Sequence, residues 1–255
     1  MPLGHAASIV SPEPAAGWQE KPVVHAEHFM AVTAHPLATR TAVDVLVNGG
    51  TAVDAAVAAQ MVLNLVEPQS SGIGGGAFML YWDAVARRLH ALDGRETAPI
   101  AADTNYFRDV NGIPLKWRKA MVGGRAVGVP GTLHLLHTAH DLFGVKSWAD
   151  LLEPTITLAT GGFAVSPRLA QSIAGAADRG LRQFSAARQY FFDAHGKPLK
   201  AGFILRNPAL ANALRKIAQE GIEPFYQGPI ASRLVKALEN TSELPALMTL
   251  SLIHI

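Results

Sequence analysis

The segment 52–66 carries apolar side chains on nearly every side, and it limits the choice of fold more than any other part of the chain. A capping box formed by Thr51 and Asp54 precedes it and Pro68 follows it, so we predict a helix that ends near Leu65. Three polar residues interrupt the apolar run: Asp54, Gln60 and Asn64. A helix without a polar face is buried, because it would otherwise expose apolar surface to water. The sequence therefore predicts a layered fold that covers this helix on all sides.

The composition excludes several classes of protein and of site. Apolar residues make up 49% of the 255 residues and charged residues only 16%, whereas intrinsic disorder needs low hydrophobicity and high charge. The net charge of +2 is a near balance of 22 basic and 20 acidic residues, so no nucleic-acid footprint is predicted. The absence of cysteine excludes disulfides, zinc–thiolate sites and cysteine nucleophiles. No apolar run reaches about 18 residues, so no membrane span is predicted.

A glycine-rich run, Gly72–Gly76, separates the apolar helix from a predicted hairpin. With Ala77 it fits the dinucleotide-binding pattern G-x-G-x-x-A, but that motif needs a strand before it and a helix after it. Here the order is reversed, which favours a close approach of this backbone to a neighbour, a ligand or another chain. The segment Ala77–Trp82 is apolar on both faces, as in a strand buried between layers. Leu89–Leu92 is predicted to return antiparallel to it.

The other patterns predict short strands before a helical half of the chain. Phe29–Thr33 reads as a short buried strand, and Met121–Val129 as another strand with glycines at its bulges. A helix is predicted over Pro36–Val47, and the chain is mostly helical from Gly131, with Pro154 expected to divide two helices. Further helices are predicted to begin after three residues: Ser166, Asn207 and Gly228. Strands in the first half and helices in the second predict an α+β layered domain.

Three histidines at helical spacing, His134, His137 and His140, raise the question of a metal site. Successive steps of three residues rotate by about 60° around a helix, so the three side chains would diverge. No carboxylate or cysteine completes a zinc-binding spacing. We therefore interpret the histidines as a solvated face and predict no metal site. The sequence also lacks a Ser-His-Asp order, a G-x-S-x-G elbow and a P-loop.

Arg95 is the charged residue best placed to bind a ligand. It directly follows the second hairpin strand, between Asp93 and Glu96. An arginine at a strand end can present a planar pair of donors to a carboxylate. A local ion pair with one of its acidic neighbours is the alternative interpretation. The residue pattern by itself leaves both open.

A series of motifs along the chain resembles the gamma-glutamyltransferases (glutathione hydrolases). In order, they are AHPLAT at 34–39, NGGTAVDAAVA at 48–58, VEPQSSGIGGGAFML at 66–80, LDGRETAP at 92–99, GVPGT at 128–132, GFAVSPRLA at 162–170, NPALA at 207–211 and FYQGPIA at 225–231. The resemblance extends from about residue 30 to about residue 249. Because the motifs are numerous and keep their order, the resemblance is specific to this family.

The resemblance implies an N-terminal-nucleophile hydrolase fold of αββα layers, incomplete here, with a mostly helical C-terminal half. Precursors in this family cleave themselves into a large and a small subunit. The small subunit then begins with a threonine whose hydroxyl is the nucleophile and whose amine is the base. This threonine accepts the γ-glutamyl group of glutathione and passes it to water, an amino acid or a peptide. No metal or organic cofactor is implied.

Arg95 matches the family arginine that holds the α-carboxylate of the γ-glutamyl group, so the resemblance implies a substrate-binding role for it. Holding that carboxylate would position the distant amide for attack. We expect Glu96 and Asp93 to orient the guanidinium, and Gly72–Gly76 to serve packing. The resemblance assigns no catalytic residue to this chain.

The threonine-rich junction of the family, T-T-H before a strand, does not occur in these 255 residues. We therefore expect a fragment that is inactive alone, with a flexible lead-in at 1–27, a partial large-subunit domain at 28–250 and an off-pattern tail at 251–255. Its expected partners are glutathione or another γ-glutamyl compound, the rest of the large subunit and the small subunit. The lack of a leader predicts a cytoplasmic location, or a periplasmic or secreted one if the N-terminus is incomplete. The alternatives are a related cephalosporin or glutaryl acylase and a non-catalytic truncated remnant.

Overall fold

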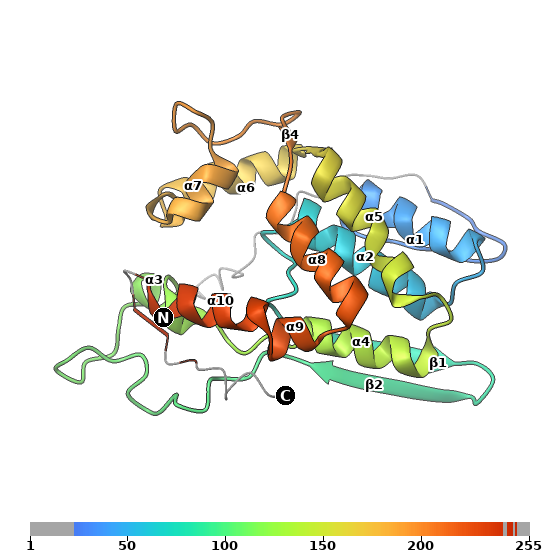
Figure 1. Ribbon diagram of the computed structural model, residues 1–255, viewed down its shortest axis with the longest axis horizontal. Coiled ribbons are helices and arrows are strands. Elements are labelled where there is room, and N and C mark those ends of the chain that lie inside the picture. Colours follow the sequence, from blue (N-terminus) through green and yellow to red (C-terminus); the bar gives the residue numbers. More distant parts are fainter. Residues whose placement is uncertain (1–22, 242–243, 247, 249–255) are drawn as a thin grey trace, which may run out of the picture.

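The computed structural model describes residues 23–241, 244–246 and 248, which form a helix-rich molecule with one long hairpin (Figure 1). The longer helices are α1 (Pro36–Val47), α2 (Ala52–Val66), α4 (Thr132–Phe143), α5 (Trp148–Gly161), α6 (Pro167–Ala177), α8 (Pro208–Glu220) and α10 (Pro229–Glu239). The shorter ones are α3 (Trp117–Ala120), α7 (Ser185–Phe191), α9 (Glu223–Tyr226) and the 3-10 turns Gly124–Ala126 and Leu181–Gln183. The strands are β1 (Ala77–Asp83), β2 (Arg88–Gly94), β3 (Phe163–Ala164) and β4 (Ile204–Leu205).

Helix α2 lies at the centre of the molecule, as the sequence predicts. Eleven of its fifteen residues are buried, and α1, α4 and α5 pack around it (Figure 1). The predicted capping box forms: the Asp54 N–H donates to Thr51 Oγ1 at 3.1 Å, and the Thr51 N–H donates to the Asp54 carboxylate at 2.8 Å. The fully buried Asp54 also accepts the backbone N–H groups of Val145 and Lys146 at 3.1 and 3.4 Å. The polar end of the buried helix thereby holds the connection between α4 and α5.

The β1–β2 hairpin lies along α4 and is covered on one face only (Figure 1). Its strands pair antiparallel with Tyr81 opposite His90. Met79, Tyr81 and Leu92 are partly buried against the core. The outer face carries Phe78, Leu80 and Trp82, which are 69%, 73% and 56% exposed. The prediction of a strand buried on both faces is therefore wrong within the described residues, because only one helical layer of this chain reaches the hairpin.

Two predicted strands are absent from the described chain. Phe29–Thr33 has no partner strand, and Phe29 and Met30 are exposed. Met121–Val129 contains the 3-10 turn instead, and only Val129 pairs, in a single bridge to Thr97. A strand forms only where a neighbouring strand can pair with its backbone N–H and C=O groups. The apolar pattern of a short segment does not show whether such a neighbour exists.

The helical half agrees with the prediction except at Pro154, which lies inside a continuous α5. The residue four positions earlier, Asp150, is exposed, so water can satisfy the carbonyl that proline leaves without a helical partner. The predicted N-caps form: Ser166 Oγ accepts the Leu169 N–H at 3.0 Å, and Asn207 Oδ1 accepts the Leu210 N–H at 2.9 Å.

Among the described residues, every helix is too short or too polar to span a bilayer. The predicted tail at 251–255 and most of the lead-in at 1–27 lie outside the described residues. The division of the chain into these segments therefore stays a prediction.

Candidate functional site

Arg95 lies immediately after β2, and its guanidinium contacts the neighbouring carboxylate. Arg95 Nη1 is 2.7 Å from Glu96 Oε2. Asp93 acts differently from the expectation, because its carboxylate accepts the Arg95 backbone N–H at 2.9 Å and so holds the turn rather than the guanidinium. The Arg95 side chain is 65% exposed, and within the described residues its guanidinium has no other ion-pair partner. The ion pair of the alternative interpretation therefore forms with Glu96, and most of the Arg95 side chain remains accessible to solvent.

Gly76 of the glycine-rich run and Gly128, which precedes α4, both lie very close to Glu96. A Cβ atom on Gly76 would lie 2.5 Å from the Glu96 backbone N, and one on Gly128 would lie 2.9 Å from the Glu96 Cβ. Real Cβ atoms do not come this close to backbone, so a side chain at Gly76 would displace Glu96. The interpretation that the glycine run permits a close approach is confirmed at Gly76, whose neighbour is the residue that pairs with Arg95, whereas Gly72 and Gly74 have no comparably close neighbour.

The start of α4 is joined to the same cluster. Gly75 O accepts the N–H groups of Gly131 and Thr132 at 2.9 and 3.0 Å. Gly131 in turn packs against the Gly94 backbone with no space for a Cβ. The glycine run, the end of β2 and the N-terminus of α4 therefore meet at one point, directly beside Arg95.

Tyr226 of α9 fixes the start of α4 from the other side. Its hydroxyl donates to Pro130 O at 3.0 Å and accepts the His134 N–H at 3.1 Å. Burial raises the pKa of Tyr226 to about 12, so the phenol stays protonated at neutral pH. Tyr226 belongs to the FYQGPIA motif, but the sequence does not show its hydrogen-bond partners, which are more than 90 residues away.

The histidines of α4 pack against aromatic rings instead of forming a solvated face, so that prediction is wrong. His134 lies edge-on to Tyr226 at 6.1 Å between ring centroids. His137 and His140 lie 5.0 and 5.4 Å from Trp148 at the start of α5. A one-dimensional pattern could not show that α5 and α9 cover this side of the helix. Among the described residues, no three histidine or acidic side chains form a group able to hold a metal ion.

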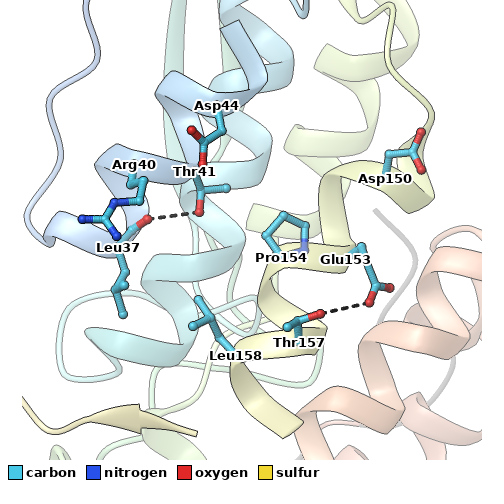
Figure 2. A pocket seen from close by; sticks show the side chains of 9 residues that line it. All are labelled: Leu37, Arg40, Thr41, Asp44, Asp150, Glu153, Pro154, Thr157 and Leu158. Carbon is cyan, nitrogen blue, oxygen red and sulfur yellow. Dashed lines mark hydrogen bonds between the residues drawn. The ribbon is translucent and has the colours of Figure 1, made fainter. Parts of the chain in front are cut away.

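A surface groove of about 510 Å³ lies between α1 and α5 (Figure 2). Its walls are Leu37, Arg40, Thr41, Asp44, Asp150, Glu153, Pro154, Thr157 and Leu158. Two hydrogen bonds are internal to the walls, from Thr41 Oγ1 to Leu37 O at 3.0 Å and from Thr157 Oγ1 to Glu153 at 3.1 Å (Figure 2). A second groove, of about 460 Å³, lies beside the first turn of α1. Arg95 lines neither groove.

Comparison with known proteins gives a consistent result. The model of the gamma-glutamyltranspeptidase family matches residues 38–251. The glutathione hydrolase proenzyme of Bacillus subtilis (strain 168) is 40% identical over 211 residues, which are 83% of this chain and 35% of that protein. The chain therefore spans about a third of the length of this curated relative.

Solved structures agree with the sequence relatives. The gamma-glutamyltranspeptidase of Helicobacter pylori superimposes with a TM-score of 0.85 at 32% identity, over 91% of this chain and 65% of that chain. A cephalosporin acylase from Bacillus halodurans superimposes with a TM-score of 0.76 at 29% identity, over 90% of this chain and 43% of that chain. These neighbours share the N-terminal-nucleophile hydrolase fold, so the described helices and hairpin are an incomplete part of that α+β architecture. By its sequence and its fold, this chain belongs to the gamma-glutamyltranspeptidase family.

Proposed function

We propose that this chain is part of the large subunit of a gamma-glutamyltransferase proenzyme, and that Arg95 binds the α-carboxylate of the γ-glutamyl donor. In the proposed reaction, a threonine hydroxyl attacks the γ-glutamyl amide of glutathione, an ester forms and the amine leaves. Water, an amino acid or a peptide then attacks the ester and frees the threonine. Arg95 would hold the donor so that its amide reaches the nucleophile.

The observation that carries this proposal is the arrangement of Arg95 and Glu96 at the end of β2. Glu96 is closely packed against Gly76 and Gly128 and contacts one nitrogen of the guanidinium, and the Arg95 side chain is 65% exposed, so its other donors are accessible to a ligand. A guanidinium presents paired donors that match a carboxylate in two parallel hydrogen bonds.

Arg95 needs to be shielded from water by further protein before it can bind a donor carboxylate tightly. An ion pair at a position that is 65% exposed is weak, because water competes for both partners. We infer that polypeptide beyond these 255 residues covers Arg95 and supplies the threonine nucleophile, for which this chain has no T-T-H sequence. The apolar outer face of the hairpin is a suitable contact surface for that polypeptide.

Replacement of Arg95 in the full-length proenzyme tests the proposal. We expect Arg95→Ala to lower kcat/KM for γ-glutamyl-p-nitroanilide by about 100-fold or more, since a desolvated pair of this kind is worth roughly 3–5 kcal/mol. Self-cleavage should continue, because Arg95 acts on the donor. Arg88→Ala, on the same hairpin and exposed, is the matched control. An Arg95→Ala enzyme with unchanged kcat/KM would refute the carboxylate-binding role.

A second candidate function, a glutaryl or cephalosporin acylase, is favoured by the likeness to the Bacillus halodurans enzyme. Glutaryl and γ-glutamyl amides share the carboxylate and differ only in the α-amino group. Faster hydrolysis of glutaryl-p-nitroanilide than of γ-glutamyl-p-nitroanilide would support the acylase, and the reverse would support the transferase.

The proposed dependence on further polypeptide has its own test. We expect the 255-residue chain alone to leave γ-glutamyl-p-nitroanilide intact. An in-frame threonine junction in the gene downstream of codon 250 supports the proenzyme, whereas a stop codon after residue 255 supports a non-catalytic remnant.

A further inference from the structure

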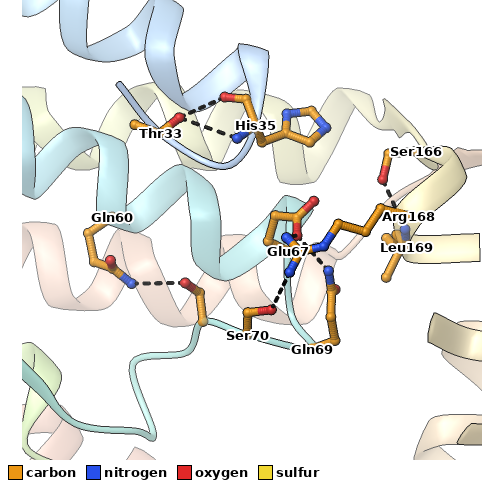
Figure 3. Close-up of polar contacts among 10 residues, drawn as sticks. Thr33, His35, Gln60, Glu67, Gln69, Ser70, Ser166, Arg168 and Leu169 are labelled. Atoms are coloured by element: carbon orange, nitrogen blue, oxygen red, sulfur yellow. Dashed lines mark hydrogen bonds and ion pairs between the residues drawn. The ribbon is translucent and has the colours of Figure 1, made fainter. Parts of the chain in front are cut away.

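An ion pair between a buried glutamate and a partly exposed arginine joins the end of α2 to the start of α6, and the proposed reaction does not use it. Glu67, whose side chain is only 2% exposed, pairs with Nη1 of Arg168 (Figure 3). Gln69 Nε2 also donates to the Glu67 carboxylate, at 2.5 Å. Burial raises the pKa of Glu67, and Arg168 opposes that shift. Taking a carboxylate out of water is costly, and such pairs add little net stability compared with apolar packing. The pair therefore calls for a role other than stability.

The pair holds the turn that leads into the glycine run. Arg168 Nη2 donates to Ser70 Oγ at 3.3 Å, so one guanidinium contacts both Glu67 and Ser70 (Figure 3). Glu67 O accepts the N–H groups of Ser70 and Ser71, each at 3.0 Å. Gln60 of α2 donates to Ser71 Oγ at 3.4 Å. The first residues after α2 are thus fixed by contacts from two helices.

The same segment ends against Glu96 a few residues later. Gly75 bonds to the start of α4, and Gly76 lies so close to Glu96 that no side chain fits between them. Glu96 in turn contacts Arg95 at 2.7 Å. A continuous chain of contacts therefore runs from Arg168, through Glu67 and the glycine run, to the Arg95 guanidinium.

We propose that Arg168 is a positioning residue for substrate binding. By holding Glu67 and Ser70, it fixes the place where the glycine run meets Glu96. The position of Glu96 then sets the orientation in which Arg95 binds the carboxylate of the donor. This inference rests on the proposed function of Arg95. Arg168 touches no substrate in it. Its effect is restricted to donors that carry the carboxylate.

Two acyl donors separate this role from a general structural one. γ-Glutamyl-p-nitroanilide has the α-carboxylate, and 4-aminobutyryl-p-nitroanilide is the same donor without it. In the full-length proenzyme, we expect Arg168→Met to raise KM for the first by about 3- to 30-fold, with kcat changed less than about twofold. The kcat/KM for the second donor should stay at the wild-type value. An equal loss on both donors would overturn the proposal.

Three further variants make the test robust to poor folding. Arg168→Lys keeps the charge beside Glu67 but cannot contact Ser70 at the same time, so its KM should be intermediate. Ser70→Ala removes one hydroxyl and leaves no buried charge unpaired, so it should give a smaller shift in the same direction. Arg206→Met is the matched control, since it removes an exposed arginine whose guanidinium, among the described residues, bonds only to Gly161 O, at 3.0 Å. Unchanged KM values in both Arg168→Lys and Ser70→Ala would also overturn the proposal.

A double mutant locates the effect at Arg95. If Arg168 acts through Arg95, then adding Arg168→Met to Arg95→Ala should cause no further loss, whereas independent effects would multiply. A wild-type enzyme that does not prefer the donor with the carboxylate contradicts the proposed function itself. In another outcome, the wild-type enzyme prefers the donor with the carboxylate, loses that preference in Arg95→Ala and keeps it in Arg168→Met. That outcome contradicts the inference about Arg168 and leaves the proposed function of Arg95 standing.

Discussion

Helix α2 and the β1–β2 hairpin have the same sequence property and opposite surroundings. Both α2 and the first strand of the hairpin, β1, carry apolar side chains on nearly every face. In the described part of the chain, α2 is enclosed by α1, α4 and α5, whereas the hairpin is covered only where it meets α4 (Figure 1). An apolar pattern thus shows that a segment needs neighbours on all sides. It does not show whether the same chain provides them.

The uncovered face of the hairpin has an energetic consequence. Burying a large apolar side chain contributes about 1.5–3 kcal/mol to the free energy of unfolding. Phe78, Leu80 and Trp82 contribute little of this in the described chain, because they are mostly exposed. Exposed apolar faces of this kind usually mark contact surfaces. The contrast with α2 therefore supports the proposal that further polypeptide lies on this face.

The largest effect should come from the same substitution made in both regions. Leu65→Ala in α2, where the leucine is 1% exposed, should lower the free energy of unfolding of this chain by about 3–5 kcal/mol. Leu80→Ala in the hairpin, where the leucine is 73% exposed, should change it by less than about 0.5 kcal/mol. Urea unfolding of the two variants measures both values. Similar losses in the two would contradict the structural difference.

An intermediate effect is expected when the hairpin variant is made in the full-length protein. If further polypeptide covers the outer face, Leu80→Ala should there cost about 2–3 kcal/mol, because the leucine becomes buried. Asp83, at the end of β1, provides a polar control, and Asp83→Asn should have a similar small effect in both forms. A cost for Leu80→Ala that stays near zero in the full-length protein would show that the face remains exposed.

The smallest effect concerns α4, which separates the two regions. Tyr226→Phe should lower the free energy of unfolding by about 1–2 kcal/mol at pH 7, because the buried Pro130 O and the partly buried His134 N–H lose their partner. The pKa of Tyr226 is raised to about 12, above the usual tyrosine value of about 10. This contribution is therefore complete below pH 10 and falls as the pH rises toward 12. Unfolding measured from pH 7 to 11 checks the trend, and a constant difference between wild type and variant would refute it.

Part of the site could be predicted from the sequence because it depends on neighbours in the chain. The position of Arg95 at a strand end, its acidic neighbour Glu96 and the glycine run have local signatures, whereas the substrate-binding role of Arg95 comes from the family resemblance and stays a prediction. The Glu67–Arg168 pair was missed, because its members are 101 residues apart and each one resembles an ordinary surface residue in the sequence. The histidines of α4 were misinterpreted for the same reason, since their partners Trp148 and Tyr226 come from other helices.

The sequence by itself determined the helices that have caps and apolar spacing, the hairpin and the family, because capping, turn formation and motif order are properties of nearby residues. Only the tertiary structure decided which apolar faces are covered, that Pro154 is tolerated inside α5, and that the segment after α2 is fastened by Arg168 before it reaches Glu96. Those outcomes depend on the packing of segments far apart in the chain. Packing is settled by shape and burial in three dimensions, and local pattern does not encode them.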